Sequence, residues 1–191
     1  IIMQTDEADL ARIFWDYGEE TASRRIAKAV CRVREETGIT STSQLAAIIH
    51  SVMPAKRPGQ IDPATRSFQA LRIFVNRELD ELTAGLEAVE RLLRPGGILA
   101  VVSFHSLEDR IVKRFLASRG QHASRPSRHR PVIDGPAPSF EILRRKAILP
   151  IEDERNQNSR ARSAKLRIAR RTDAPPLGMA AAPTSAANQA I

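Results

Sequence analysis

The sequence contains very little cysteine, and this scarcity excludes several classes of protein. Cys31 is the only cysteine among the 191 residues, so no disulfide can form within the chain. A disulfide-stabilised secreted domain is therefore excluded, and the composition favours a cytoplasmic protein. The four histidines and the single cysteine show no metal-ligand spacing, so we predict no metal site.

Long apolar runs and glycine-rich loops are also missing. No apolar run approaches the ~20 residues that a membrane-spanning helix needs. The nine glycines never form a glycine-rich loop between a strand and a helix. The pair Gly96-Gly97 precedes its predicted strand, whereas a loop that cradles a nucleotide follows one. We therefore expect that this chain cannot hold a nucleotide-like cofactor by itself.

Aromatic residues make up only 4% of the chain, which excludes a broad stacking platform for bases. Trp15 and Tyr17 could each stack on a base, but packing in the core is the interpretation that we favour for Trp15.

Charge is plentiful but unevenly placed. Residues 1–118 hold 16 Lys and Arg against 16 Asp and Glu, whereas residues 119–171 hold 14 against 5. The net charge of +8 therefore comes from the second segment. Such a block predicts a polyanionic partner, with a solvated basic surface as the alternative.

The first half of the chain is predicted to be helical, because apolar residues recur at steps of three and four. Ser41 and Gln44 form a capping-box pattern before one of these helices. The longest pattern has a possible break between Thr83 and Gly85. The predicted helices span residues 6–16, 20–37, 42–53 and 63–93, with a loop at 54–61.

The second half shows a different pattern of apolar residues, which favours strands as well as helices. Residues 98–104 form an unbroken apolar run after a Pro-Gly-Gly turn, which favours a strand buried on both faces in a parallel sheet. The later predicted elements are a helix at 107–118, a loop at 119–138, a strand at 140–148, a helix at 152–157 and a strand at 161–169.

This order of elements indicates an α/β protein. Three strands are too few for a complete sheet, so we expect the other strands to come from elsewhere. We predict a helical domain at residues 1–82 and an α/β domain at 83–171. Residues 172–191, rich in Ala and Pro, are predicted to be a disordered tail.

The run from Ser103 to Arg110 is the candidate catalytic site. It follows the first predicted strand, and open α/β sheets bind ligands beyond the carboxyl ends of their strands. His105 is a candidate proton acceptor or hydrogen-bond partner there. The alternative is structural, because Ser106 with Asp109 fits an N-cap pair. A hydrolase triad of His105, Ser106 and Asp109 is disfavoured, because triads converge from separate elements.

Seven basic residues are candidate RNA contacts. Arg160 and Arg162 are expected beside the start of the last strand, within reach of phosphate. For the arginines on helices, a solvated or salt-bridged side chain is the alternative. The candidates are Arg24, Arg25, Arg66, Arg72, Arg160, Arg162 and Lys165.

Four blocks of sequence carry a family resemblance. They contain Tyr-Gly-Glu-Glu and Ser-Arg-Arg-Ile-Ala (17–27), Pro-Ala-Thr-Arg and Phe-Gln-Ala-Leu-Arg-Ile (63–76), Ser-Phe-His-Ser-Leu-Glu-Asp-Arg (103–113) and Arg-Ala-Arg-Ser-Ala-Lys-Leu-Arg (160–167). Together they resemble the RsmH (MraW) family of 16S ribosomal RNA methyltransferases over roughly residues 8–170. The chain departs from the family at Asp62, where His is usual, and at Asn158-Ser159, where Asn-Pro is frequent.

The resemblance implies a fold, a reaction and a partner. The fold is a class I, Rossmann-like methyltransferase sheet, to which this chain supplies the C-terminal strands. The helical domain at residues 1–82 would be an insert that binds the substrate. The reaction is methyl transfer from S-adenosylmethionine to N4 of a cytidine in 16S ribosomal RNA of the small subunit. His105 and Ser106 would then form one wall of the catalytic pocket.

The resemblance also places the cofactor-binding residues upstream of Ile1, so none is assigned within this chain. We therefore expect the chain alone to be inactive. The alternative function is a non-catalytic RNA-binding module with a basic C-terminal arm.

Overall fold

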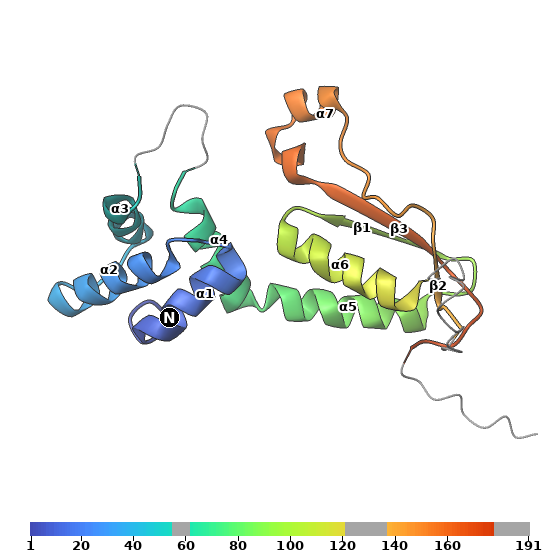
Figure 1. Cartoon of the computed structure of the whole chain (residues 1–191), viewed down its shortest axis with the longest axis horizontal. Helices are drawn as coiled ribbons and strands as arrows, with labels where there is room; N and C mark the ends of the chain where they lie inside the picture. Colours follow the sequence, from blue (N-terminus) through green and yellow to red (C-terminus); the bar gives the residue numbers. More distant parts are fainter. Residues whose placement is uncertain (55–61, 121–136, 178–191) are drawn as a thin grey trace, which may run out of the picture. The chain divides into compact units, whose positions relative to one another are not determined.

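A computed structural model describes residues 1–54, 62–120 and 137–177 (Figure 1). The chain divides into two compact units, residues 1–78 and 79–191. Most of the predicted loops at 54–61 and 119–138, together with residues 178–191 of the predicted tail, lies outside the described residues.

The first unit is helical, as its periodicity predicts. Ser41 and Gln44 form the predicted capping box at the start of the third helix. The core joins apolar faces of all four helices, with Phe14, Ile26 and Ile49 fully buried. The helices are α1 (Glu7–Gly18), α2 (Ser23–Glu36), α3 (Thr42–Val52) and α4 (Thr65–Asn76).

Helix α1 meets α4 at a glycine. A β-carbon added to Gly18 would lie 2.6 Å from the carbonyl oxygen of Arg66 and 3.2 Å from the β-carbon of Ala70. The two backbones therefore approach more closely than any side chain at position 18 allows. The block around Gly18 and the block around Arg66, far apart in sequence, are packed against each other.

The long apolar pattern is interrupted at Arg77, not at the predicted 83–85. Arg77 adopts a left-handed conformation with φ 51°, and its amide bonds to the carbonyl oxygen of Phe74. Helix α5 (Glu78–Leu92) then begins at once and continues through Gly85. The apolar periodicity hides this break, because a left-handed cap occupies a single residue.

The second unit places helices on a small sheet (Figure 1). Side chains of α5 and α6 share a buried cluster with the sheet, including Leu86, Val112 and Phe140. The short helix at 152–157 is found as predicted. The elements after α5 are β1 (Ile98–Ser103), α6 (Ser106–Arg119), β2 (Phe140–Ile142), α7 (Glu152–Gln157), the 3₁₀ helix η1 (Ser159–Ser163) and β3 (Lys165–Arg171).

Each strand pairing in the described sheet is antiparallel. The strand order is β1-β3-β2, so the prediction of a parallel sheet is wrong for this part of the chain. Burial is also one-sided on β1, since Leu99 is 7% exposed whereas Ile98 and Val102 are 50% and 52% exposed. The apolar run does not reveal this difference, because both faces of β1 carry apolar side chains.

The last two strands differ in length from their predictions. Strand β2 ends at Ile142 rather than at 148, although Ile148 forms an isolated bridge with Leu166. Strand β3 begins at Lys165 rather than at 161, because residues 159–163 form a 3₁₀ helix.

A buried arginine at the end of β3, Arg171, joins several segments of the second unit through hydrogen bonds. Arg171 is 6% exposed and donates through Nε to the carbonyl oxygen of Glu90, 3.0 Å away. One of its terminal nitrogens also donates to the carbonyl oxygens of Ser139, Thr172 and Ala174. Part of the segment assigned to the tail is therefore hydrogen-bonded to the α/β unit.

The buried carboxylate of Glu90 forms its ion pair with Arg119. It is 2% exposed, and one carboxylate oxygen accepts from Arg119 Nε at 2.6 Å. The other accepts from the Ser139 hydroxyl and from the amide of Leu177. Burial alone would raise the pKa of Glu90, but these hydrogen bonds outweigh it and lower the pKa.

None of the helices in the described ranges has both the length and the apolar character needed to cross a membrane.

We expect Gly18→Ala to lower the free energy of unfolding by about 1–3 kcal/mol, because the new methyl group meets the Arg66 carbonyl oxygen. Urea unfolding followed by circular dichroism measures this change. Gly85→Ala is the matched control, since nothing lies within 4 Å of its added β-carbon. That substitution should stabilise helix α5 by about 0.5–1 kcal/mol. Equal stability of the two variants would contradict the close approach of α1 and α4.

Candidate functional site

The turn between β1 and α6 is held by a reciprocal cap. His105 is the N-cap residue, and its side chain accepts a hydrogen bond from the amide of Glu108. The Glu108 carboxylate accepts from the amides of Phe104 and His105 in return. The predicted cap pair of Ser106 with Asp109 is therefore wrong by one residue. A histidine nitrogen replaces the usual hydroxyl or carboxylate acceptor.

The cap also constrains the chemistry of the imidazole. Nδ1 of His105 lies 3.4 Å from the Glu108 amide and acts as acceptor, which assigns the hydrogen of the neutral ring to Nε2. Nε2 is buried and lies 3.3 Å from a Glu108 carboxylate oxygen, without the alignment of a hydrogen bond. The side chain is 11% exposed. Ser106, in contrast, is exposed.

Asp109 links the start of α6 to strand β3. Arg167 donates to both of its carboxylate oxygens, from Nε at 2.7 Å and from a terminal nitrogen at 3.2 Å. Lys165 lies 3.4 Å from the same carboxylate. The hydrogen bond from Arg167 lowers the pKa of Asp109, with burial opposing it and the charges of Arg167 and Lys165 assisting. Lys165, a candidate RNA contact, thus has an anionic partner within the fold.

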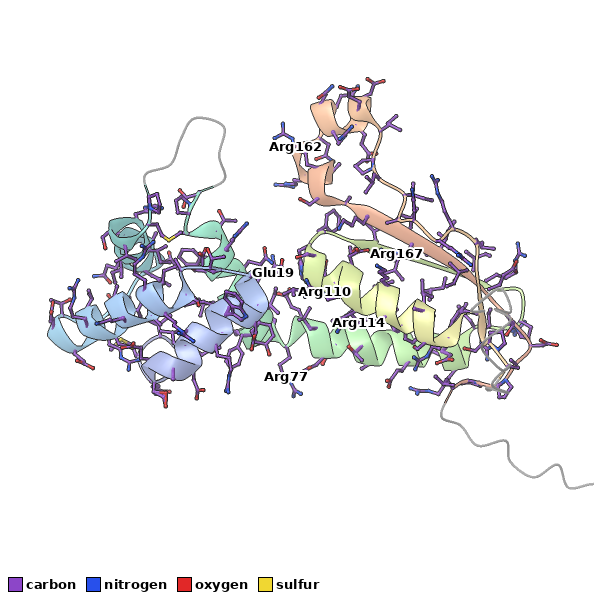
Figure 2. The ribbon with its side chains drawn as sticks, viewed as in Figure 1. Glu19, Arg77, Arg110, Arg114, Arg162 and Arg167 are labelled. Carbon is purple, nitrogen blue, oxygen red and sulfur yellow. The ribbon has the colours of Figure 1, made fainter. Side chains whose placement is uncertain are left out.

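Arg160 and Arg162 lie in η1, which directly precedes β3, so both are beside the start of the last strand as predicted, although within a 3₁₀ helix. Both are exposed, and Figure 2 shows Arg162 in this element with Arg167 further along on β3. The side chain of Asn158 accepts from the amide of Arg160 at 3.1 Å and so fixes the start of η1. The structure therefore presents two cations on a capped turn just before β3.

Two candidate arginines of the first unit have partners within the protein. Arg66 donates to the carbonyl oxygen of Glu19 at 3.3 Å, beside the close approach at Gly18. Arg72 forms two hydrogen bonds with Glu78, at 2.8 and 3.0 Å. Both side chains remain exposed, so these bonds orient them and leave their surfaces open.

The first unit also carries a histidine–aspartate pair that spacing in the sequence does not reveal. Nε2 of His50 lies 2.8 Å from Oδ1 of Asp62, and both side chains are nearly half exposed. They line a cavity of about 570 Å³ together with Arg72. Asp62 also accepts from the amide of Ala64. The acid at position 62 therefore caps the approach to α4 and binds His50.

Arg24 and Arg25 line a different cavity in the first unit, at the start of α2. Trp15 lines it too and is 56% exposed, so the expectation that Trp15 packs in the core is wrong.

Sequence reasoning missed the role of Arg167, although a signal for it existed. Lys165 and Arg167 are two residues apart on one strand, so their side chains face the same side of the sheet. Two cations on one side of a strand indicate either solvent or a carboxylate on that side, and the structure supplies the carboxylate of Asp109.

Comparison with known proteins identifies the class to which this fold and turn belong. The sequence model of the MraW methylase family matches residues 1–172. The chain therefore belongs to the MraW methylase family, as its four sequence blocks predict.

Individual relatives carry a more specific name. A protein of Paramagnetospirillum magneticum (strain AMB-1) is 57% identical over 177 residues, covering 92% of this chain and 55% of the relative. One from Azorhizobium caulinodans is 55% identical over 175 residues, covering 92% and 50%. One from Ruegeria sp. (strain TM1040) is 50% identical over 181 residues, covering 95% and 55%. Each is named Ribosomal RNA small subunit methyltransferase H, and the chain spans about half of their length.

Acid should weaken the second unit through Asp109. The pKa of Asp109 is lower in the folded protein than its ordinary 3.8, so folding favours the ionised carboxylate. Its contribution is therefore complete above that value and is lost as the pH falls through the lowered value. We expect Asp109→Asn to cost about 3 kcal/mol of stability at pH 7, because it leaves Arg167 poorly paired. The cost should shrink below a pH of about 4.

Urea unfolding at a series of pH values measures this effect. Glu141→Gln is the control, because Glu141 pairs with Arg170 at a site where both side chains are about half exposed. It should change stability by less than about 1 kcal/mol. A pH profile for Asp109→Asn that runs parallel to that of the parent chain would contradict the proposed linkage.

Proposed function

We propose that this chain forms part of an S-adenosylmethionine-dependent enzyme that methylates N4 of a cytidine in 16S ribosomal RNA. The single observation that carries the proposal is membership of the MraW methylase family over residues 1–172. The printed name of the relatives and the basic composition of residues 119–171 support it. The partner is then the small ribosomal subunit, and the location is the cytoplasm.

We assign the cofactor contacts to residues outside this chain. Gly96 and Gly97 lie in the turn that precedes β1, where Gly97 bonds back to Arg94. In the described residues, the turn that does follow β1 contains no glycine and is filled by the His105–Glu108 cap. These residues do not fit a nucleotide cradle.

The two units of the chain have different proposed roles. The β1–α6 unit and the strands after it would be the C-terminal part of a class I, Rossmann-like methyltransferase domain, with 98–103 as its fifth strand. The helical unit would be an inserted substrate-binding domain. The candidate RNA contacts then occur in both units.

The chemistry of the target amine determines what the catalytic site must do. The N4 lone pair of cytosine is delocalised into the ring, so the amine is a weak nucleophile and must be held in line with the methyl group. The base must also leave its stack to be reached. Ser106 is exposed and is assigned to the wall of the base pocket. His105 is largely covered and is assigned to hold the turn in place.

A chimera tests the activity. The matching segment of the Paramagnetospirillum magneticum relative is replaced by this chain, and methyl transfer from labelled S-adenosylmethionine to small ribosomal subunits is measured. We expect N4-methylcytidine in the digested RNA. Binding of the subunits without methylation would favour the non-catalytic RNA-binding module. The chain alone should not bind S-adenosylmethionine, and clear binding would refute the assignment of that site.

Two substitutions of His105 in the chimera separate a cap from a catalytic imidazole. Asn is a good N-cap residue and Ala is not. We expect His105→Asn to keep near-parental turnover and His105→Ala to lose tenfold or more, on the order expected for a misplaced site. If both variants are equally impaired, the imidazole itself takes part in the reaction.

If Arg160 and Arg162 contact phosphate, replacing both with Ala should flatten the salt dependence of RNA binding. The slope of log affinity against log salt should fall by about 0.7–0.9 for each lost contact. Fluorescence anisotropy of a labelled RNA measures it. Arg170→Ala is the control, since Arg170 is paired with Glu141. An unchanged slope in the double variant removes η1 from the interface.

A further inference from the structure

Trp15 is the only tryptophan of the chain, and it is 56% exposed on helix α1. A side chain of this size usually buries most of its surface, because its burial from water is strongly favourable. The exposed ring therefore calls for an explanation, which its surroundings provide.

The ring lines a cavity between α1 and α2. The cavity has a volume of about 830 Å³, within the range of small-molecule and nucleotide sites. Arg12, Arg24 and Arg25 line it with Trp15, and no carboxylate side chain is among its lining residues. A hollow with an aromatic wall and three guanidinium groups is complementary to a flat, anionic ligand.

The three arginines are not equivalent. Arg12 pairs with Asp9 at 2.9 Å, and Arg25 points a terminal nitrogen toward the sulfur of Met53. Arg24 has no ion-pair or hydrogen-bond partner in the described part of the chain. It is therefore the guanidinium most available to a ligand.

The start of helix α2 adds positive potential to the same hollow. Its N-cap residue, Ala22, offers no side-chain acceptor to the first-turn amides, and no acidic residue lies in that turn. The nearby Glu20 is buried and is engaged with the amide of Ala22. The Ser23 amide bonds to the carbonyl oxygen of Glu20, which leaves the amides of Arg24 and Arg25 at this helix end for an anion.

We infer that this cavity binds one nucleotide of single-stranded RNA, with the base stacked on Trp15 and the phosphate held by Arg24 and the start of α2. An aromatic ring beside cations is the usual arrangement for binding unpaired nucleotides without regard to sequence. Duplex RNA does not fit, because its bases are already stacked. The inference rests on the proposed RNA substrate and adds a site on the helical unit for an unpaired stretch of it.

Because Trp15 is the only tryptophan, its fluorescence reports directly on the cavity. The 191-residue chain is titrated with an oligocytidine RNA of about eight nucleotides. We expect saturable quenching of the tryptophan emission. Inorganic polyphosphate of equal charge should compete for the arginines but leave the emission unchanged, because it has no bases to stack.

Three variants separate stacking from charge, with affinity measured by anisotropy of a labelled oligonucleotide. Trp15→Ala should weaken binding on the order of tenfold. Arg24→Ala should lower the salt slope by about 0.7, the value for one contact with a single strand. Arg32→Ala is the matched control, since it removes an exposed charge from the same helix but not from this cavity. Circular dichroism confirms that each variant folds.

Three results would overturn the inference. The first is RNA binding that leaves the tryptophan emission of the parent chain unchanged and keeps its full affinity in Trp15→Ala. This result places the RNA elsewhere and leaves the proposed function intact. The second is equal quenching by polyglutamate, which makes the occupant an acidic protein segment. The third is no binding of the oligonucleotide at all, in which case methylation by the chimera decides separately whether the proposed function survives.

Discussion

The ion pair between Asp109 and Arg167 is the interaction on which the candidate catalytic turn depends. It joins the first turn of α6 to the middle of β3, the central strand of the described sheet. The turn that carries His105 and Ser106 lies between Ser103, which pairs with Lys165 of β3, and Asp109, which is bonded to Arg167 of the same strand. Because the pair is mostly buried, losing one partner leaves a charge that water cannot fully solvate. The position of the turn is thus set by electrostatics across the sheet as well as by the local cap.

Local patterns predicted most of the helices, and non-local contacts account for the misses. The capping box at Ser41 is complete within four residues, so it can be read directly from the sequence. The break at Arg77 and the one-sided burial of β1 have no such local signature. The site shows the same contrast. The turn after β1 was located correctly, but its cap partners and the exposure of Trp15 depend on packing that no spacing rule describes.

The four sequence blocks that carry the family resemblance include residues that pack the helices together as well as candidate site residues. In the first block, Gly18 makes room for the Arg66 carbonyl, and Tyr17 packs its ring against Phe74 with centroids 5.8 Å apart. Glu20, buried in the same block, supports the start of α2. Much of what makes this motif recognisable therefore holds α1, α2 and α4 together. Residues that recur in a family need not touch its substrate.

The hydrogen bonds around Arg171 and Glu90 bear on where this domain can be cut. Composition suggests a boundary near residue 171, because the sequence beyond it is rich in Ala and Pro. A truncation there would remove two carbonyl acceptors from Arg171 and the Leu177 amide from Glu90. Both side chains would stay buried with fewer partners, at a cost in stability. For expression or fusion, the folded unit should be taken to extend at least to residue 177.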